Sequence, residues 1–213
     1  MRLLIPFAIA LALSPALPRD GRAQDPRLRG RLDAPTLSAV TSSIDSARAV
    51  GLPTEPLVRK ALEGARKGAD GARIAASVRT LAAHLGVART ALGARAGEAE
   101  LTSAAAALYV GVRSDDLRRV QARAGGRSTA MAFVALAFLV QQGVTPETSS
   151  RLIESLVGAR ASDDELMLLQ RQVAADVGSG APPGDAAAAR ARGLLDRHGA
   201  APPDGRLPSA ARP

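Results

Sequence analysis

Lys60, Glu63 and Lys67 form the most unusual group of charged side chains in this chain of 213 residues. The 28 Lys and Arg residues include only two lysines, and both stand close to Glu63. In a helix the three positions fall within about 60° of one another on one side of the axis. The carboxylate can pair with Lys60 at i,i+3 and with Lys67 at i,i+4, and exposed pairs of this kind contribute only a few tenths of a kcal/mol. A solvated strip of ion pairs is therefore the interpretation that these residues favour.

Gly64 suggests an alternative in which the same surface binds a partner. On the helix circumference it lies beside Leu57, on the border between the charged strip and an apolar stripe. A glycine at such a border lets another backbone approach closely, while the lysine ammonium groups attract an anionic partner. The candidate binding surface consists of Lys60, Glu63, Gly64 and Lys67.

Residues 51–74, GLPTEPLVRKALEGARKGADGARI, carry a resemblance to other proteins. The segment resembles one in uncharacterised exported bacterial proteins with the pattern G-L-P-x-E-P-L-x-x-K-x-x-E-G-x-x-K-G. The resemblance implies export of this chain. No known activity comes with it.

The two histidines, His84 and His198, lack the companions that a metal site requires. Neither belongs to an H-x-x-x-H pair, so a zinc site would need ligands assembled from distant carboxylates. We expect both rings at solvated helix positions, and we predict no metal and no cofactor.

Two acidic groups, Asp115-Asp116 and residues 163–165, are the remaining candidates for acid/base chemistry. Each stands where a helix is expected to begin, and carboxylates there complement the helix dipole. Tyr109 is expected to fill the core with its hydroxyl at the edge. The chain contains no G-x-S-x-G elbow, P-loop or G-x-G-x-x-G fingerprint. We predict no catalysis; an enzyme whose site is spread over several helices is an alternative.

Apolar residues recur at helical spacing along most of the chain. The longest series runs from Ile74 to Leu92 in alternating steps of four and three, which predicts one long helix despite Gly86. No comparable alternation with a period of two is present. We therefore predict an all-α fold without a sheet, an irregular array of about nine helices built from helical hairpins.

The turns between these helices share a sequence pattern. Gly51, Gly111 and Gly143 each follow a helical stripe and precede an apolar residue. Glycine suits the left-handed position just after a helix end. We therefore predict that a helix ends before each of these glycines.

Hydroxyl side chains mark the starts of the following helices. Thr54, Ser114 and Thr145 are expected to accept hydrogen bonds from the open amides of the first turn. Ser162 and Glu165 have the spacing of a capping box.

Residues 130–140, AMAFVALAFLV, are apolar on every side. A helix of this kind lies at the centre of a domain or in a membrane, and eleven residues are too few to cross a bilayer. We predict a central helix in which Phe138 is deeply buried.

The N-terminus has the layout of a secretory signal peptide. One arginine precedes an apolar stretch over residues 3–13, and prolines and small residues follow. The stretch is shorter than the roughly 20 residues that cross a bilayer, so we predict no transmembrane span in the mature chain. Small residues at Gly21 and Ala23 predict cleavage after Ala23, with Gln24 as the mature N-terminus. Cleavage at residues 14–16 is a weaker alternative.

These patterns predict four segments. Residues 1–23 are the signal peptide and residues 24–32 a mobile leader. Residues 33–198 form the all-α domain, with a weak division near 93–97, and residues 199–213 form a proline-rich disordered tail.

Composition narrows the classes of partner. The absence of cysteine excludes disulfides and thiolate chemistry. The formal net charge of +8 favours anionic partners. Nucleic acid is not expected, because after residue 23 only Tyr109, Phe133 and Phe138 offer aromatic faces for base stacking.

We therefore expect an exported, soluble protein of the cell envelope, in the periplasm or outside the cell. Its expected role is that of a protein-interaction or scaffold module, with an envelope protein as partner. Binding of anionic lipid or wall polymer by the arginines is the alternative.

Overall fold

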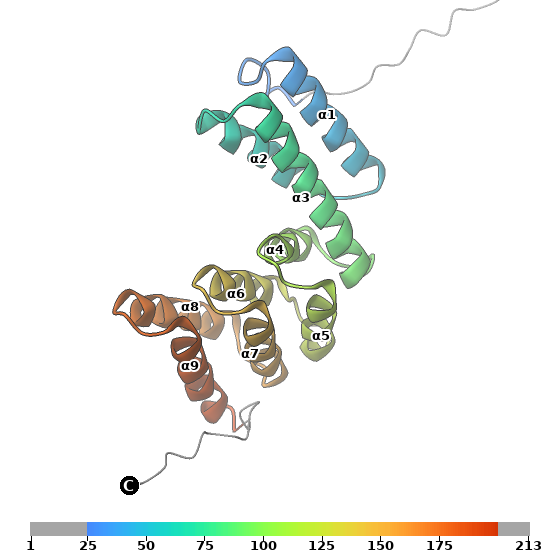
Figure 1. The fold of residues 1–213 in the computed structure, drawn as a ribbon. Helices are drawn as coiled ribbons and strands as arrows, with labels where there is room; N and C mark the ends of the chain where they lie inside the picture. The colour runs from blue at the N-terminus through green and yellow to red at the C-terminus, as the bar shows by residue number, and fades with distance from the viewer. Residues whose placement is uncertain (1–24, 200–213) are drawn as a thin grey trace, which may run out of the picture.

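Helices make up most of the described chain, which covers residues 25–199 of the computed structural model (Figure 1). Nine helices and no strand are present in that range, which confirms the predicted all-α class. The helices are α1 (Ala34–Ala49), α2 (Glu55–Arg66), α3 (Gly71–Leu92), α4 (Glu98–Tyr109), α5 (Ser114–Ala124), α6 (Ala130–Gln141), α7 (Pro146–Gly158), α8 (Asp163–Gly178) and α9 (Pro183–Arg197).

The helices pack in two rows. Helices α4, α6 and α8 lie side by side in one row, and α3, α5, α7 and α9 form the other (Figure 1). Contacts of α3 with α4, of α6 with α7 and of α8 with α9 join the rows. At the N-terminal end, α1 and α2 both pack on α3. Because α2 packs chiefly on α3, it does not continue the row of α4, α6 and α8.

Helix α6 holds the central place predicted for it, between α4 and α8 and against α7. Phe133 and Leu136 are fully buried there, but Val134 is 42% exposed and Phe138 is only partly buried. The prediction of deep burial for Phe138 is therefore wrong, because a helix in an outer row keeps one face uncovered. None of the helices in residues 25–199 is both long and apolar enough to cross a membrane.

The predicted glycine turns are present. At Gly51, where φ is 70°, the amide of Leu52 donates to the carbonyl of Ala47 at 2.9 Å. The same closure follows Gly111 and Gly143 at helix ends. This is the Schellman arrangement, which satisfies carbonyls that the last helical turn leaves open.

The predicted caps are present at two of the four helices. Thr145 caps α7, and Ser162 with Glu165 forms a complete capping box at α8. Thr54 makes no side-chain cap bond to α2, and its backbone is helical rather than extended. Ser114 already lies within α5 and caps nothing. The two latter predictions are wrong.

The segment expected to be a mobile leader is instead an ordered turn from residue 25 to residue 32. Leu28 is fully buried in the core. Arg27 bridges Asp25 and Glu55, at 2.7 Å from a carboxylate oxygen of each. One apolar anchor and a pair of charge-assisted hydrogen bonds hold the segment against the start of α2. The expected signal peptide, Gln24 and residues 200–213 lie outside the described residues.

The core continues across residues 93–97. Helix α3 packs against both α4 and α5, and Leu92 and Leu101 belong to one cluster of buried side chains. The weak division of the domain that the sequence predicts near residues 93–97 therefore does not separate the core into two parts.

Candidate functional site

Helix α2 presents the predicted strip of charged side chains. The carboxylate of Glu63 accepts from Nζ of Lys67 at 2.5 Å and from Nζ of Lys60 at 3.3 Å. These hydrogen bonds, that from Lys67 above all, hold the pKa of Glu63 below its ordinary value. The three side chains are 37% to 64% exposed, so the pairs contribute little to stability. Both ammonium groups keep donors open for another anion.

The cations of α2 come as two Arg-Lys pairs, Arg59-Lys60 and Arg66-Lys67. A spacing of seven residues returns to nearly the same side of a helix after two turns. The lysines therefore line one side of α2 and the arginines the neighbouring side, with Glu63 between them. Of these four cations, only the two lysines belong to the binding surface predicted from the sequence.

Gly64 lies against Ile74 of α3. A Cβ atom at position 64 would be 2.8 Å from Cγ1 of Ile74 and 3.5 Å from its Cδ1. Ile74 is 4% exposed, so it belongs to the core. The close neighbour is thus a side chain within the fold, whereas the sequence had suggested a neighbouring backbone. Gly64 allows α2 and α3 to pack closely.

A groove runs between α2 and α4, with α3 as its floor. Its first hollow has a volume of about 470 Å³ and is lined in part by Lys60, Glu63, Gly64, Lys67, Arg73, Ser77 and Tyr109. A second hollow of about 380 Å³ shares Lys60 and Tyr109 with the first and extends to Gln141 at the end of α6. We call the two hollows together the α2–α4 groove. All four predicted surface residues line it.

Tyr109 is the exposed aromatic side chain of this groove. It is 70% exposed, so the prediction of a core position is wrong. It is the last residue of α4, and α2 does not continue the row of helices that would cover it. Its ring meets the ring of His84 edge-on, with centroids 6.1 Å apart and planes at 74°. An exposed tyrosine offers a large apolar face and a hydroxyl, as binding hot spots do.

The prediction of solvated histidines holds for His198, which is exposed at the end of α9, and fails for His84, which is partly buried. Nδ1 of His84 is buried without a hydrogen-bond partner among the described residues. Nε2 of His198 lies 3.0 Å from Oε1 of Glu165 and joins the end of α9 to the start of α8. Within residues 25–199 no group of three or more His, Asp or Glu side chains is placed to hold a metal ion.

The two acidic groups serve the helices that they begin. Asp115 and Asp116 pair with Arg118 and Arg119 within α5. Glu165 accepts from the Ser162 amide at 2.8 Å. Figure 1 places α5 and α8 on opposite sides of the molecule. The structure therefore does not bring these carboxylates together.

No protein-family model, curated protein or solved structure matches the chain. The candidate site therefore rests on its own residues and geometry. Sequence reasoning missed Arg73 and misplaced Tyr109, because both join the site only through the packing of α3 and α4 beside α2. A signal for Tyr109 did exist, since it precedes a helix-ending glycine by two residues and helix ends are commonly exposed.

Proposed function

We propose that this chain is an exported protein-interaction module that binds an acidic segment of a partner protein in the α2–α4 groove. The observation that carries the proposal is the exposure of Tyr109, 70% open to solvent, in a groove whose rim is rich in cations. Tyrosine in such a position supplies apolar contact at a low cost in side-chain entropy.

The charge of the rim supports an acidic partner. Lys60, Lys67 and Arg73 stand against one carboxylate, Glu63. Glu63 is shared by the two lysines, and no ion pair engages Arg73 in the described chain. The surplus of positive charge attracts an acidic segment and accelerates its association. Binding of this kind weakens as salt screens the charges.

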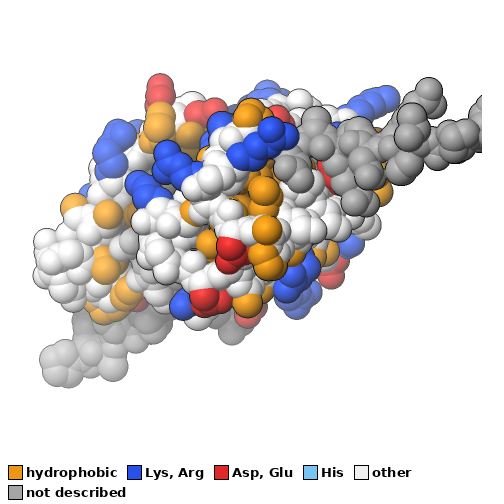
Figure 2. Space-filling model, turned by 90° about the horizontal axis from the view of Figure 1, so that it is seen from above, with side chains coloured by type: hydrophobic (Ala, Val, Ile, Leu, Met, Phe, Trp, Pro, Cys, Tyr) orange, Lys and Arg blue, Asp and Glu red, His pale blue; other side chains and the backbone are white. Residues whose placement is uncertain are grey.

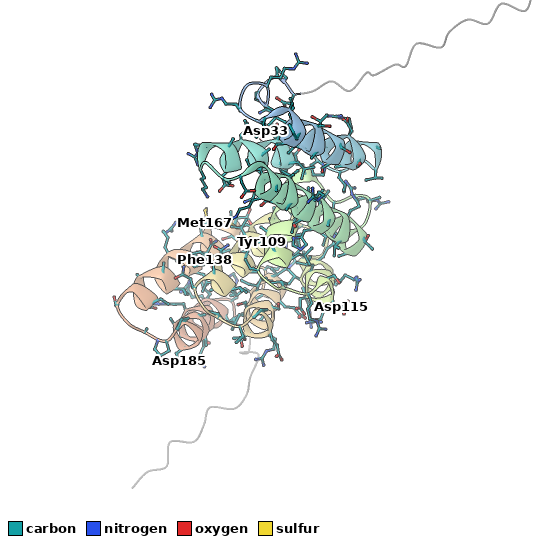
Figure 3. All side chains as sticks on the ribbon, turned by 45° about the horizontal axis from the view of Figure 1, so that its top comes forward. Asp33, Tyr109, Asp115, Phe138, Met167 and Asp185 are labelled. Atoms are coloured by element: carbon teal, nitrogen blue, oxygen red, sulfur yellow. The ribbon has the colours of Figure 1, made fainter. Side chains whose placement is uncertain are left out.

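The form of the groove supports an extended or helical segment rather than a small molecule. The two hollows join along α3, and the second reaches Gln141 on α6. Val134, Phe138 and Gln141 lie on one face of α6 at spacings of four and three, so a partly apolar face continues beyond the groove. Figure 3 shows Tyr109 and Phe138 on the same side of the molecule. A partner segment can therefore place an apolar side chain beside Tyr109 and continue over α6.

Export is part of the same proposal and rests on the N-terminal pattern. A short apolar stretch is followed by small residues before Gln24, which is the layout of a cleaved signal peptide. The partner is accordingly sought among envelope proteins.

Photo-crosslinking in the source organism tests the proposal. A benzophenone amino acid replaces Tyr109 in one strain and Val50 in a control strain. Val50 is 69% exposed and does not line the groove, so the two probes are equally accessible. We expect a discrete adduct at position 109, mapped to an acidic segment of one protein, and none at position 50. Identical adducts at both positions, or none at position 109, would contradict the proposal.

A further inference from the structure

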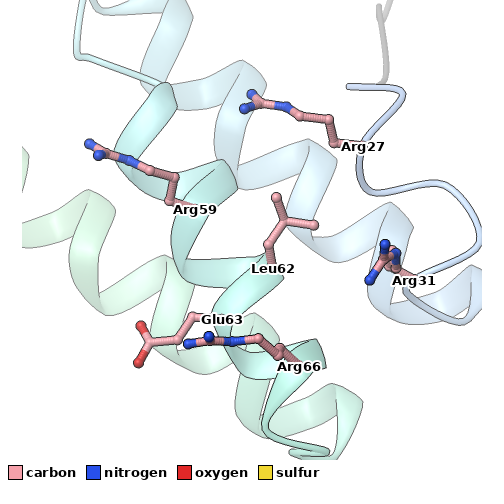
Figure 4. Close-up of a pocket in the computed structure, with 6 residues that line it drawn as sticks. All are labelled: Arg27, Arg31, Arg59, Leu62, Glu63 and Arg66. Atoms are coloured by element: carbon pink, nitrogen blue, oxygen red, sulfur yellow. The ribbon is translucent and has the colours of Figure 1, made fainter.

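A separate hollow, outside the α2–α4 groove, lies on the arginine side of α2, next to the turn over residues 25–32. It has a volume of about 490 Å³ and is lined by Arg27, Arg31, Arg59, Leu62, Glu63 and Arg66 (Figure 4). We call it the arginine bowl. Glu63 lines both the bowl and the first hollow of the α2–α4 groove, and so lies between the two sites. The bowl exists only because the segment expected to be mobile is folded against α2.

The cations of the bowl are largely unneutralised. Within residues 25–199, Arg31 and Arg66 take part in no ion pair. Arg59 has only a long contact of 4.0 Å with Glu55. Each guanidinium group carries a positive charge and five N–H donors. The fold leaves several guanidinium groups with open donors around one hollow.

The carboxylates beside the bowl are already engaged. Glu63 accepts hydrogen bonds from Lys60 and Lys67 on its other side. Glu55 is bound by Arg27 at 2.7 Å, which also fixes Arg27 in place. The bowl therefore carries surplus positive charge with one arginine already positioned.

Figure 4 shows how the side chains are arranged. Leu62 lies in the middle, with Arg27 and Arg31 on one side and Arg59 and Arg66 on the other. The guanidinium groups stand around Leu62 and do not converge on one point. A single carboxylate would satisfy one of them. Separated anionic groups, with a carbon portion over Leu62, match the whole arrangement.

Guanidinium groups bind phosphate oxygens in pairs, in the plane of their fixed fork of donors. Figure 2 views the end of the molecule formed by α1 to α3 and shows Lys and Arg side chains standing among hydrophobic ones there. We propose that the arginine bowl binds a ligand that presents two or more neighbouring phosphate groups. Such groups occur in a free polyphosphate and in adjacent headgroups of an anionic lipid surface.

Two probes separate these sources. The full-length mature chain is titrated with inorganic tripolyphosphate by calorimetry, and is sedimented with vesicles of phosphatidylglycerol or of phosphatidylcholine. The test variant is Arg31→Gln with Arg66→Gln. The control is Arg192→Gln with Arg197→Gln, two exposed arginines of α9 that also lack ion pairs in the described chain. Neither pair of arginines makes an ion pair that stabilises the fold, so both variants should have the same Tm as the wild type.

We expect the test variant to bind its phosphate probe at least about tenfold more weakly, because two guanidinium groups that donate charge-assisted hydrogen bonds to phosphate are lost. The control should change affinity less than about twofold, since isolated exposed charges contribute little. Binding of tripolyphosphate identifies a free ligand, and binding of phosphatidylglycerol vesicles alone identifies a lipid surface. Either result, lost in the test variant, supports phosphate binding by the arginine bowl. Binding of neither probe, or an equal loss in the control, would overturn it. Tyr109 lies outside the bowl, so this result is independent of the α2–α4 groove.

Discussion

Gly64→Ala tests the close packing of α2 on α3. The new Cβ would lie 2.8 Å from Cγ1, 3.5 Å from Cδ1 and 3.6 Å from Cβ of Ile74. Carbon atoms in contact prefer separations of about 3.5–4.0 Å. Ile74 is buried and β-branched, so its Cγ1 is stiff and cannot turn away freely. Either α2 must shift away from α3 or Ile74 must leave its rotamer.

Two opposed contributions decide the sign of the change. Overpacking a core site costs roughly 1–3 kcal/mol. Replacing a glycine by alanine within a helix gains about 1 kcal/mol. We expect the overpacking cost to win, with a net loss of about 1 kcal/mol and a fall in Tm of roughly 2–4 °C for a domain of this size.

Gly86→Ala is the matched control, because Gly86 lies within α3 and nothing lies within 4 Å of its added Cβ. It should stabilise the chain by roughly 0.5–1 kcal/mol. Equilibrium unfolding in urea measures both variants, with the m-values compared to confirm that the unfolding reaction is the same. In an Ile74→Ala background, which removes Cγ1, Gly64→Ala should become stabilising. If Gly64→Ala stabilises the original chain as much as Gly86→Ala does, the packing argument is refuted.

Four further predictions concern the core, the capping box of α8 and the N-terminus. Phe133→Ala should lower the free energy of unfolding by roughly 3–5 kcal/mol because Phe133 is fully buried. Phe138→Ala should lower it clearly less in the same urea assay, because Phe138 is only partly buried. Ser162→Ala should cost about 1 kcal/mol as the cap of α8 is lost. The Ser162 amide holds the pKa of Glu165 below its ordinary value. The stability lost in Glu165→Gln should therefore be full at pH 7 and shrink as pH falls through the lowered pKa, and an equal loss at pH 7 and in strong acid would contradict this. Intact mass of the protein from its source should begin at Gln24; a mature chain that retains Met1 would remove the argument for export.

The helices and many of their ends could be predicted from the sequence, because their signals are local. Alternating steps of three and four residues mark each buried stripe, and Gly51 and Gly111 mark helix ends by their own backbone preference. The end of α7 carries no such mark. Arg160 takes the left-handed position there, with φ of 64°, and the Ala161 amide closes the turn at 2.9 Å. A non-glycine in that role has no signal in the sequence.

The candidate site was only half predictable, because it depends on which helices pack together. Lys60 and Lys67 stood out by type and spacing alone. Tyr109 joined them because α2 packs on α3 and leaves the end of α4 uncovered. In the same way, every position of α6 is apolar near Phe133 and Phe138, so only the neighbouring helices decide which of the two is buried. Such choices depend on long-range contacts that periodicity does not encode.

The affinity of the chain for the segment that crosslinks at position 109 tests the central claim most directly. A synthetic peptide of that segment is titrated into the original chain, Tyr109→Ala, the double variant Lys60→Ala with Lys67→Ala, and Val50→Ala as control. We expect Tyr109→Ala to weaken binding at least about tenfold, as loss of an interface hot spot does. The lysine variant should weaken binding and reduce its dependence on salt, and Val50→Ala should change neither. Equal affinities of the original chain and Tyr109→Ala would contradict binding in the α2–α4 groove.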